Sequence, residues 1–126
     1  MESQGCNPSA APETAKTLRF VILRHVRQED THWDLMLEQP AAEKLATWQI
    51  HLPPEKWGLR LPAVRLPDHR RNYLQYEGEI SGGRGHVTRV DEGTVEVLER
   101  LEQDTCWRIK LNGRHIAGTF EVGPFD

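Results

Sequence analysis

The sequence predicts an all-β protein, a small antiparallel β-barrel of about eight strands with one long proline-rich loop. From residue 18 onward, apolar and polar residues alternate with a period of two, as they do in strands that bury one face. No segment shows the three-to-four-residue apolar spacing of a long amphipathic helix. Turn-forming residues separate the short strands, and closure into a barrel would remove exposed strand edges.

The chain divides into a tail and one domain. Residues 1–17 are rich in Ser, Ala, Pro, Glu and Thr with almost no large apolar side chain, so we expect a disordered tail. Residues 18–126 form the predicted barrel domain. Its strands are expected at residues 18–25, 32–38, 45–52, 73–80, 85–90, 94–100, 106–111 and 115–122.

The connections between these strands have sequences typical of turns and loops. Residues 91–93 (DEG) are a predicted turn, and residues 112–113 (NG) predict a two-residue hairpin turn because both positions tolerate positive φ. Residues 40–48 have room for one short turn of helix. Residues 53–71 contain several prolines and are predicted to be a long loop, a kind of segment that is often functional.

Composition and charge exclude several classes of protein. The 126 residues suffice for one domain, and 16 Lys and Arg against 19 Asp and Glu give a net charge of -3, so any phosphate site needs a local basic patch. No apolar run approaches the roughly 20 residues that span a bilayer, and the N-terminus lacks the apolar centre of a signal peptide. We therefore expect a soluble, cytoplasmic protein without a membrane partner. Two cysteines, Cys6 and Cys106, make neither a disulfide framework nor a thiolate metal site.

His25, His32 and Asp34 are the candidate metal ligands. Side chains two residues apart in a strand point the same way, so His32 and Asp34 share a face. A hairpin whose loop is residues 26–31 would bring His25 beside them. Two imidazoles and a carboxylate suit Mn, Fe or Zn with open positions for water and substrate, and the absence of thiolate favours manganese. From these residues alone, a solvated polar hairpin is the alternative.

A basic cluster surrounds a third histidine, His69. Arg65, Arg70 and Arg71 lie close to it in a chain that is otherwise acidic, and Tyr73 follows at the start of a predicted strand. Guanidinium groups bind phosphate through forked donors, and a nearby imidazole can donate to a phosphate oxygen or protonate a leaving alkoxide. A solvated basic loop would have the same composition, so the pattern leaves both interpretations open.

The order of these segments resembles the 3′-phosphoesterase domain of bacterial DNA ligase D and its stand-alone relatives, over about residues 18–122. The resemblance implies a small β-barrel that depends on Mn²⁺ or another divalent transition metal. It implies removal of a 3′-terminal ribonucleoside and of the remaining 3′-phosphate from DNA ends, in repair by non-homologous end joining. A monomer is expected, with a separate DNA ligase or a Ku-like protein as candidate partner. The matching segments are RFVILRH, THWDLMLE, ATWQIHLPP, RLPDHRRNYLQYEGEISGGRG, GTVEV and KLNGRHIAGTFEV.

The resemblance also assigns roles to individual residues. His25, His32 and Asp34 match the metal ligands of the family. His69 matches the histidine that faces the phosphate at the transition state, and Tyr73 matches a tyrosine that contacts the site.

Two positions depart from the pattern of the family. Met36 stands where the family has an arginine that binds phosphate, and Leu52 stands where it has a lysine. Each lost donor typically counts for about 3 kcal/mol of transition-state stabilisation. The sequence therefore leaves three hypotheses. The first is an active 3′-phosphoesterase in which arginines of residues 60–71 substitute. The others are a weakened or inactive barrel that binds nucleic-acid ends or phosphate, and an unrelated β-barrel.

Overall fold

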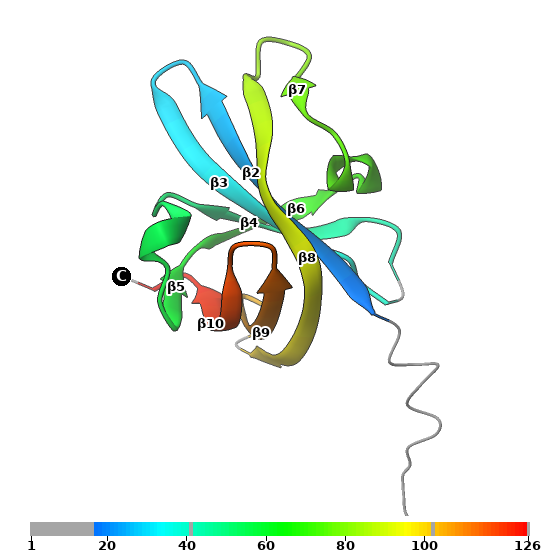
Figure 1. Ribbon diagram of the computed structural model, residues 1–126, viewed down its shortest axis with the longest axis vertical. Coiled ribbons are helices and arrows are strands. Elements are labelled where there is room, and N and C mark those ends of the chain that lie inside the picture. Colours follow the sequence, from blue (N-terminus) through cyan, green and yellow to red (C-terminus); the bar gives the residue numbers. More distant parts are fainter. Residues whose placement is uncertain (1–16, 41, 102, 126) are drawn as a thin grey trace, which may run out of the picture.

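Figure 1 shows a computed structural model of the chain, which describes residues 17–40, 42–101 and 103–125. Two short 3-10 helices, η1 (Pro54–Lys56) and η2 (Arg71–Leu74), accompany the strands, and these described ranges contain no α-helix. The strands are β2 (Leu18–Arg27), β3 (Asp30–Leu37), β4 (Leu45–Ile50), β5 (Arg60–Pro62), β6 (Val64–His69), β7 (Gly78–Glu79), β8 (His86–Leu101), β9 (Cys106–Gly113) and β10 (Ala117–Gly123).

All nine strands belong to one sheet. Eight of them lie in the order β5-β10-β9-β8-β2-β3-β4-β6, and β7 pairs with β8 beside this path. The pairs are antiparallel except β5 with β10, which is parallel. The all-β prediction is confirmed. The two terminal strands, β5 and β6, do not pair with each other in the described part of the chain, so the barrel is open rather than closed.

The central strands β2 and β3 are buried on both faces. Side chains such as Ile22 and Leu35 point into the larger core, which Trp48 and Trp107 fill. Alternate residues of the same strands point into a smaller cluster on the other face. In register along that second face, Val21 pairs with Met36, Leu23 with Asp34, His25 with His32 and Arg27 with Asp30. The apolar second face thus continues directly into the polar residues at the end of the hairpin.

Several predicted elements are wrong. Residues 53–71 are not one long loop, since they contain η1, β5 and β6. Proline is tolerated there because β5 and β6 are edge strands, and Pro67 lies where the pairing of β4 with β6 shifts register. Residues 40–48 have room for a short helical turn, but the described part of that range contains no helix, and β4 begins at Leu45. Residues 73–80 form the end of η2 and the short β7 rather than one strand.

The predicted DEG turn is also wrong, because residues 91–93 lie inside the continuous strand β8. Asp91 is buried, and its carboxylate accepts hydrogen bonds from the backbone N–H groups of Arg114, His115 and Ile116. These bonds fix the connection between β9 and β10. A Cβ on Gly93 would lie 2.2 Å from the carbonyl oxygen of Asn112, so this glycine permits close strand approach. The two-residue turn predicted at residues 112–113 is wrong: β9 and β10 form a hairpin, but residues 112–113 end β9 and residues 114–116 form the connection.

The predicted tail of residues 1–17 lies outside the described residues except for Thr17. Among the described residues, no helix has the length and apolar character needed to cross a membrane.

Candidate metal centre

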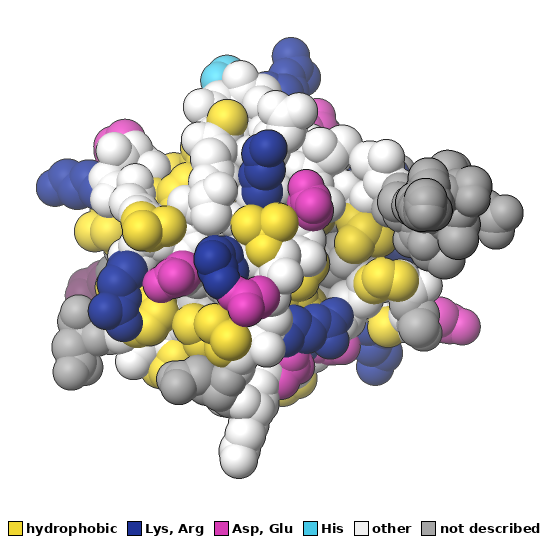
Figure 2. Space-filling view, turned by 90° about the horizontal axis from the view of Figure 1, so that it is seen from below, with side chains coloured by type: hydrophobic (Ala, Val, Ile, Leu, Met, Phe, Trp, Pro, Cys, Tyr) yellow, Lys and Arg dark blue, Asp and Glu magenta, His cyan; other side chains and the backbone are white. Residues whose placement is uncertain are grey.

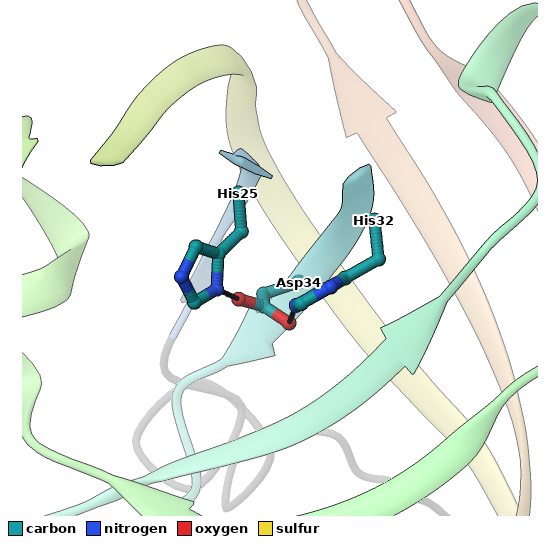
Figure 3. A group of neighbouring side chains, drawn as sticks. All are labelled: His25, His32 and Asp34. Carbon is teal, nitrogen blue, oxygen red and sulfur yellow. Dashed lines mark ion pairs between the residues drawn. The ribbon is translucent and has the colours of Figure 1, made fainter. Parts of the chain in front are cut away.

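The candidate centre lies at the end of the β2–β3 hairpin. The connection is tighter than the six-residue loop expected, because Val26 pairs with Thr31 and Arg27 with Asp30. Gln28 turns the chain with a positive φ of 55°. This hairpin places one potential ligand atom from each of His25, His32 and Asp34 within 4.8 Å of the others. Figure 3 shows both imidazole rings directed at the same carboxylate.

The Asp34 carboxylate lies between the two histidines and is 4% exposed. Its Oδ2 is 3.3 Å from His25 Nδ1, and its Oδ1 is 3.3 Å from His32 Nε2. Oδ1 is buried and accepts no hydrogen bond from the described residues. A buried carboxylate oxygen in this position is costly unless a proton or a cation completes its environment.

The outer nitrogen of each histidine is bound to an acceptor. His25 Nε2 donates to the carbonyl oxygen of Arg84 at 2.7 Å, and His32 Nδ1 donates to Asp30 Oδ2 at 3.0 Å. These partners place the hydrogen of each neutral ring on its outer nitrogen, so the nitrogens facing Asp34 carry lone pairs. Two lone pairs and a carboxylate facing one point repel one another unless a cation lies there. The donor set therefore fits a divalent metal, with its imidazoles fixed by outer partners.

The electrostatics of the cluster also favour positive charge at this point. Asp34 is the largest cause that raises the pKa of His25 and of His32 above the ordinary imidazole value, against the lowering effect of burial. Burial by itself raises the pKa of Asp34, but the two imidazoles outweigh it and hold that pKa below the ordinary value. The same field that favours a bound proton favours a bound cation.

Asp30 and His51 are neighbours of the centre that sequence reasoning missed. With His32 they form a second, more exposed group of potential ligands, and His51 Nε2 lies 3.6 Å from Asp30 Oδ1. Asp30 lies two residues before His32, so the strand-period argument that selected Asp34 selects Asp30 as well. His51 follows β4, and its proximity depends on the pairing of β4 with β3.

A cavity of about 430 Å³ opens over the candidate ligands. His69 and Tyr73 line it, with their ring centroids 5.9 Å apart. His69 Nδ1 donates to the carbonyl oxygen of Pro67 at 2.8 Å, which leaves Nε2 to act on a ligand in the cavity. The structure thus brings both residues predicted to be catalytic to the same cavity as the candidate metal ligands.

Only one of the three arginines predicted to bind phosphate lines this cavity, namely Arg70. Arg65 forms ion pairs with Asp68 and Asp104 and lies over the ring of Trp107, and Arg71 pairs with Glu38. Arg27 and Arg84, which sequence reasoning did not select, line the cavity instead.

The two positions that depart from the family pattern differ in their placement. Met36 is 1% exposed, belongs to the smaller apolar cluster and contributes to the cavity wall. Leu52 packs against the larger core and does not line the cavity. Of the two positions, Met36 is therefore the one where the absence of a basic side chain affects the site directly.

Comparison with known families finds a matching family model. The family model of the DNA ligase D 3′-phosphoesterase domain matches residues 24–123, most of the chain. A search of curated proteins finds no match. The matched range includes His25, His32, Asp34, His69 and Tyr73. The chain belongs to the DNA ligase D 3′-phosphoesterase domain family, whose role is in the repair of DNA ends.

Proposed function

We propose that this protein is a metal-dependent 3′-phosphoesterase that removes a 3′-terminal ribonucleoside and a 3′-phosphate from DNA ends. The observation that carries the proposal is the pair of imidazoles whose outer nitrogens are bound by Arg84 and Asp30, so that both inner nitrogens face the Asp34 carboxylate. Family membership supplies the substrate class. Manganese is the proposed metal, because imidazole and carboxylate without thiolate suit it.

The residues of the cavity would have different roles in the reaction. His25, His32 and Asp34 would hold the ion, which when bound supplies Lewis-acid activation of a phosphate oxygen and of water. Asp30 and the Arg84 carbonyl keep the two imidazoles in the tautomer and orientation that binding requires. His69 would donate a hydrogen bond from Nε2 to the phosphate and stabilise the charge that develops on its oxygens. Tyr73 contacts the His69 ring edge-on and limits its rotation.

One observation favours a second candidate function, in which the barrel binds DNA ends but does not catalyse their conversion. Met36 is buried in the cavity wall, and Leu66, Ile80 and Val87 add to the apolar part of the lining. An apolar wall offers no charge-assisted donor to a phosphate. The enzyme releases phosphate catalytically, whereas the binding barrel retains one DNA end per protein molecule.

The test is turnover of a primer-template that carries either a 3′-phosphate or a single 3′-ribonucleotide, with Mn²⁺ and with chelator. We expect conversion only with the metal, and its loss in His32→Ala while circular dichroism shows a folded chain. His86→Ala is the matched control, because His86 is an exposed histidine outside the cavity that pairs only with Glu79 among the described side chains. Stoichiometric binding without turnover would favour the second candidate, and conversion unaffected by chelator would contradict the proposal.

A further inference from the structure

We infer that Arg27 and Arg84, together with Arg70, form a clamp that binds the terminal phosphate of the DNA end over the candidate metal centre. This inference rests on the proposed function and deepens it by naming the groups that recognise the phosphate. The three arginines come from separate segments of the chain, yet all line the cavity that contains His25, His32 and Asp34.

Backbone geometry places Arg27 and Arg84 at the same end of the molecule. Arg27 lies two residues beyond His25 on β2, on the same strand face, and pairs in register with Asp30. Arg84 lies in the turn between β7 and β8, which projects beside the β2–β3 hairpin (Figure 1). The turn approaches β2 closely, because a Cβ on Gly85 would lie 2.3 Å from the Val26 carbonyl oxygen and 3.0 Å from Arg27 Cβ.

Arg84 has two separable functions in this arrangement. Its backbone carbonyl accepts from His25 Nε2 and so orients a candidate metal ligand. Its guanidinium donates through Nε to the Ser81 carbonyl at 2.8 Å and through one Nη to the Ser81 hydroxyl at 3.3 Å. These bonds hold the guanidinium in the turn and leave further N–H donors for a ligand, because guanidinium has five.

The aspartates of the cavity already have partners. Asp34 lies between the two histidines, Asp30 accepts from His32, and Asp68 pairs with Arg65. Among the described side chains, none of these aspartates forms an ion pair with Arg27, Arg70 or Arg84.

Across the described chain, Arg27 and Arg70 form no ion pair, and the guanidinium of Arg84 contacts only neutral groups of Ser81. On the face of the molecule seen in Figure 2, by contrast, acidic and basic side chains lie interspersed. Guanidinium groups without acidic partners at a cavity mouth fit a phosphate dianion, which accepts forked hydrogen bonds from each of them.

The clamp predicts that the protein distinguishes DNA ends by their terminal group. A 3′-phosphate meets the arginines and is bound, whereas a 3′-hydroxyl end leaves them without an anion. Binding is measured by fluorescence anisotropy on two duplexes that differ only in this group, with chelator present so that no turnover occurs. We expect wild type to prefer the 3′-phosphate duplex, and Arg27→Gln and Arg84→Gln each to reduce that preference about tenfold.

Two matched controls use arginines outside the clamp. Arg24→Gln removes a charge from β2 at a residue that faces a different groove, and Arg71→Gln removes one that pairs with Glu38. Both should keep the wild-type preference. Because the Arg84 contact with His25 is made by the backbone, Arg84→Gln should also keep the wild-type affinity for Mn²⁺, measured by calorimetry.

The outcomes separate the clamp from the proposed activity. If wild type shows no preference for the 3′-phosphate, or if both clamp variants keep it, the clamp is overturned even when His32→Ala abolishes turnover. If the preference depends on Arg27 and Arg84 but no phosphate is ever released, the clamp stands and the proposed enzymatic function fails.

Discussion

Asp30→Ala isolates the contribution of a residue that is not one of the three proposed ligands. Asp30 is exposed and accepts a hydrogen bond from His32 Nδ1 at 3.0 Å. Its removal leaves His32 free to change tautomer and to rotate, so that a hydrogen can occupy Nε2, the nitrogen that faces Asp34. Loss of such an outer partner typically lowers metal affinity about 10- to 100-fold. This corresponds to about 1.4 to 2.7 kcal/mol of binding free energy.

The free energy of unfolding of the metal-free protein should change much less. The Asp30 side chain is 54% exposed, and ion pairs of exposed side chains contribute little to stability because solvent screens them. Isothermal titration of Mn²⁺ into the metal-free protein gives the affinity, and urea unfolding gives the stability. Asp68→Ala is the control, because Asp68 lines the same cavity but bonds to Arg65 and Gln39 rather than to a histidine.

Wild-type Mn²⁺ affinity in Asp30→Ala would refute the argument that this carboxylate fixes the His32 tautomer. Another combination of results would assign the ion to a different site. If Asp30→Ala and His51→Ala abolished binding while Asp34→Ala left it intact, the metal would occupy the exposed group of Asp30, His32 and His51.

Four further predictions concern the scaffold and the pH dependence. Gly85→Ala should displace the β7–β8 turn from β2 and weaken Mn²⁺ binding about tenfold in titration calorimetry, because Gly85 has a φ of +100° and an added Cβ would clash with backbone atoms. Gly58→Ala is the control and should leave Mn²⁺ binding unchanged, because an added Cβ at Gly58 meets open space. Asp91→Ala should lower the free energy of unfolding in urea by about 3 kcal/mol, because buried backbone N–H groups of the β9–β10 connection lose their acceptor; unchanged stability would contradict this. Mn²⁺ affinity should fall as pH is lowered from 7.5 to 5.5, a range that extends about one unit to either side of the ordinary imidazole pKa. The reason is that the pKa values of His25 and His32 are raised, so protons compete more strongly with the metal for these imidazoles. In the metal-free protein the same raised pKa values of the two histidines stabilise the fold at pH values below the ordinary imidazole pKa. This stabilisation is lost as pH rises through the raised pKa values, and urea unfolding at a series of pH values measures it.

The parts of the fold that follow local rules could be predicted from the sequence. The period-two alternation identified β2 and β3, and the hairpin between them places His25 opposite His32. One strand face and one hairpin therefore sufficed to select the three residues that the structure brings together. The side chain of Asp30 follows the same rule, but residues 26–31 have the composition of a hairpin loop, so the sequence does not predict that Asp30 lies in the strand.

Other parts depend on contacts between distant segments and leave no local signal. The Arg84 carbonyl that orients His25 lies 59 residues away along the chain, and only the turn at Gly85 brings it close. Asp91 resembles a turn residue in sequence, but its carboxylate serves a connection 23 to 25 residues later. The prolines of residues 53–71 suggested a loop because sequence does not reveal which strands lie at a sheet edge.

The proposed function requires one divalent ion to lie between His25, His32 and Asp34 and to act on the 3′-phosphate of a DNA end. The most direct measurement is a crystal structure with Mn²⁺ and a duplex carrying a 3′-phosphate, with anomalous diffraction data to locate the metal. We expect an anomalous peak within bonding distance of His25 Nδ1, His32 Nε2 and an Asp34 oxygen, with the terminal phosphate beside it. A peak elsewhere, or a DNA end bound with no peak between these three residues, would contradict it.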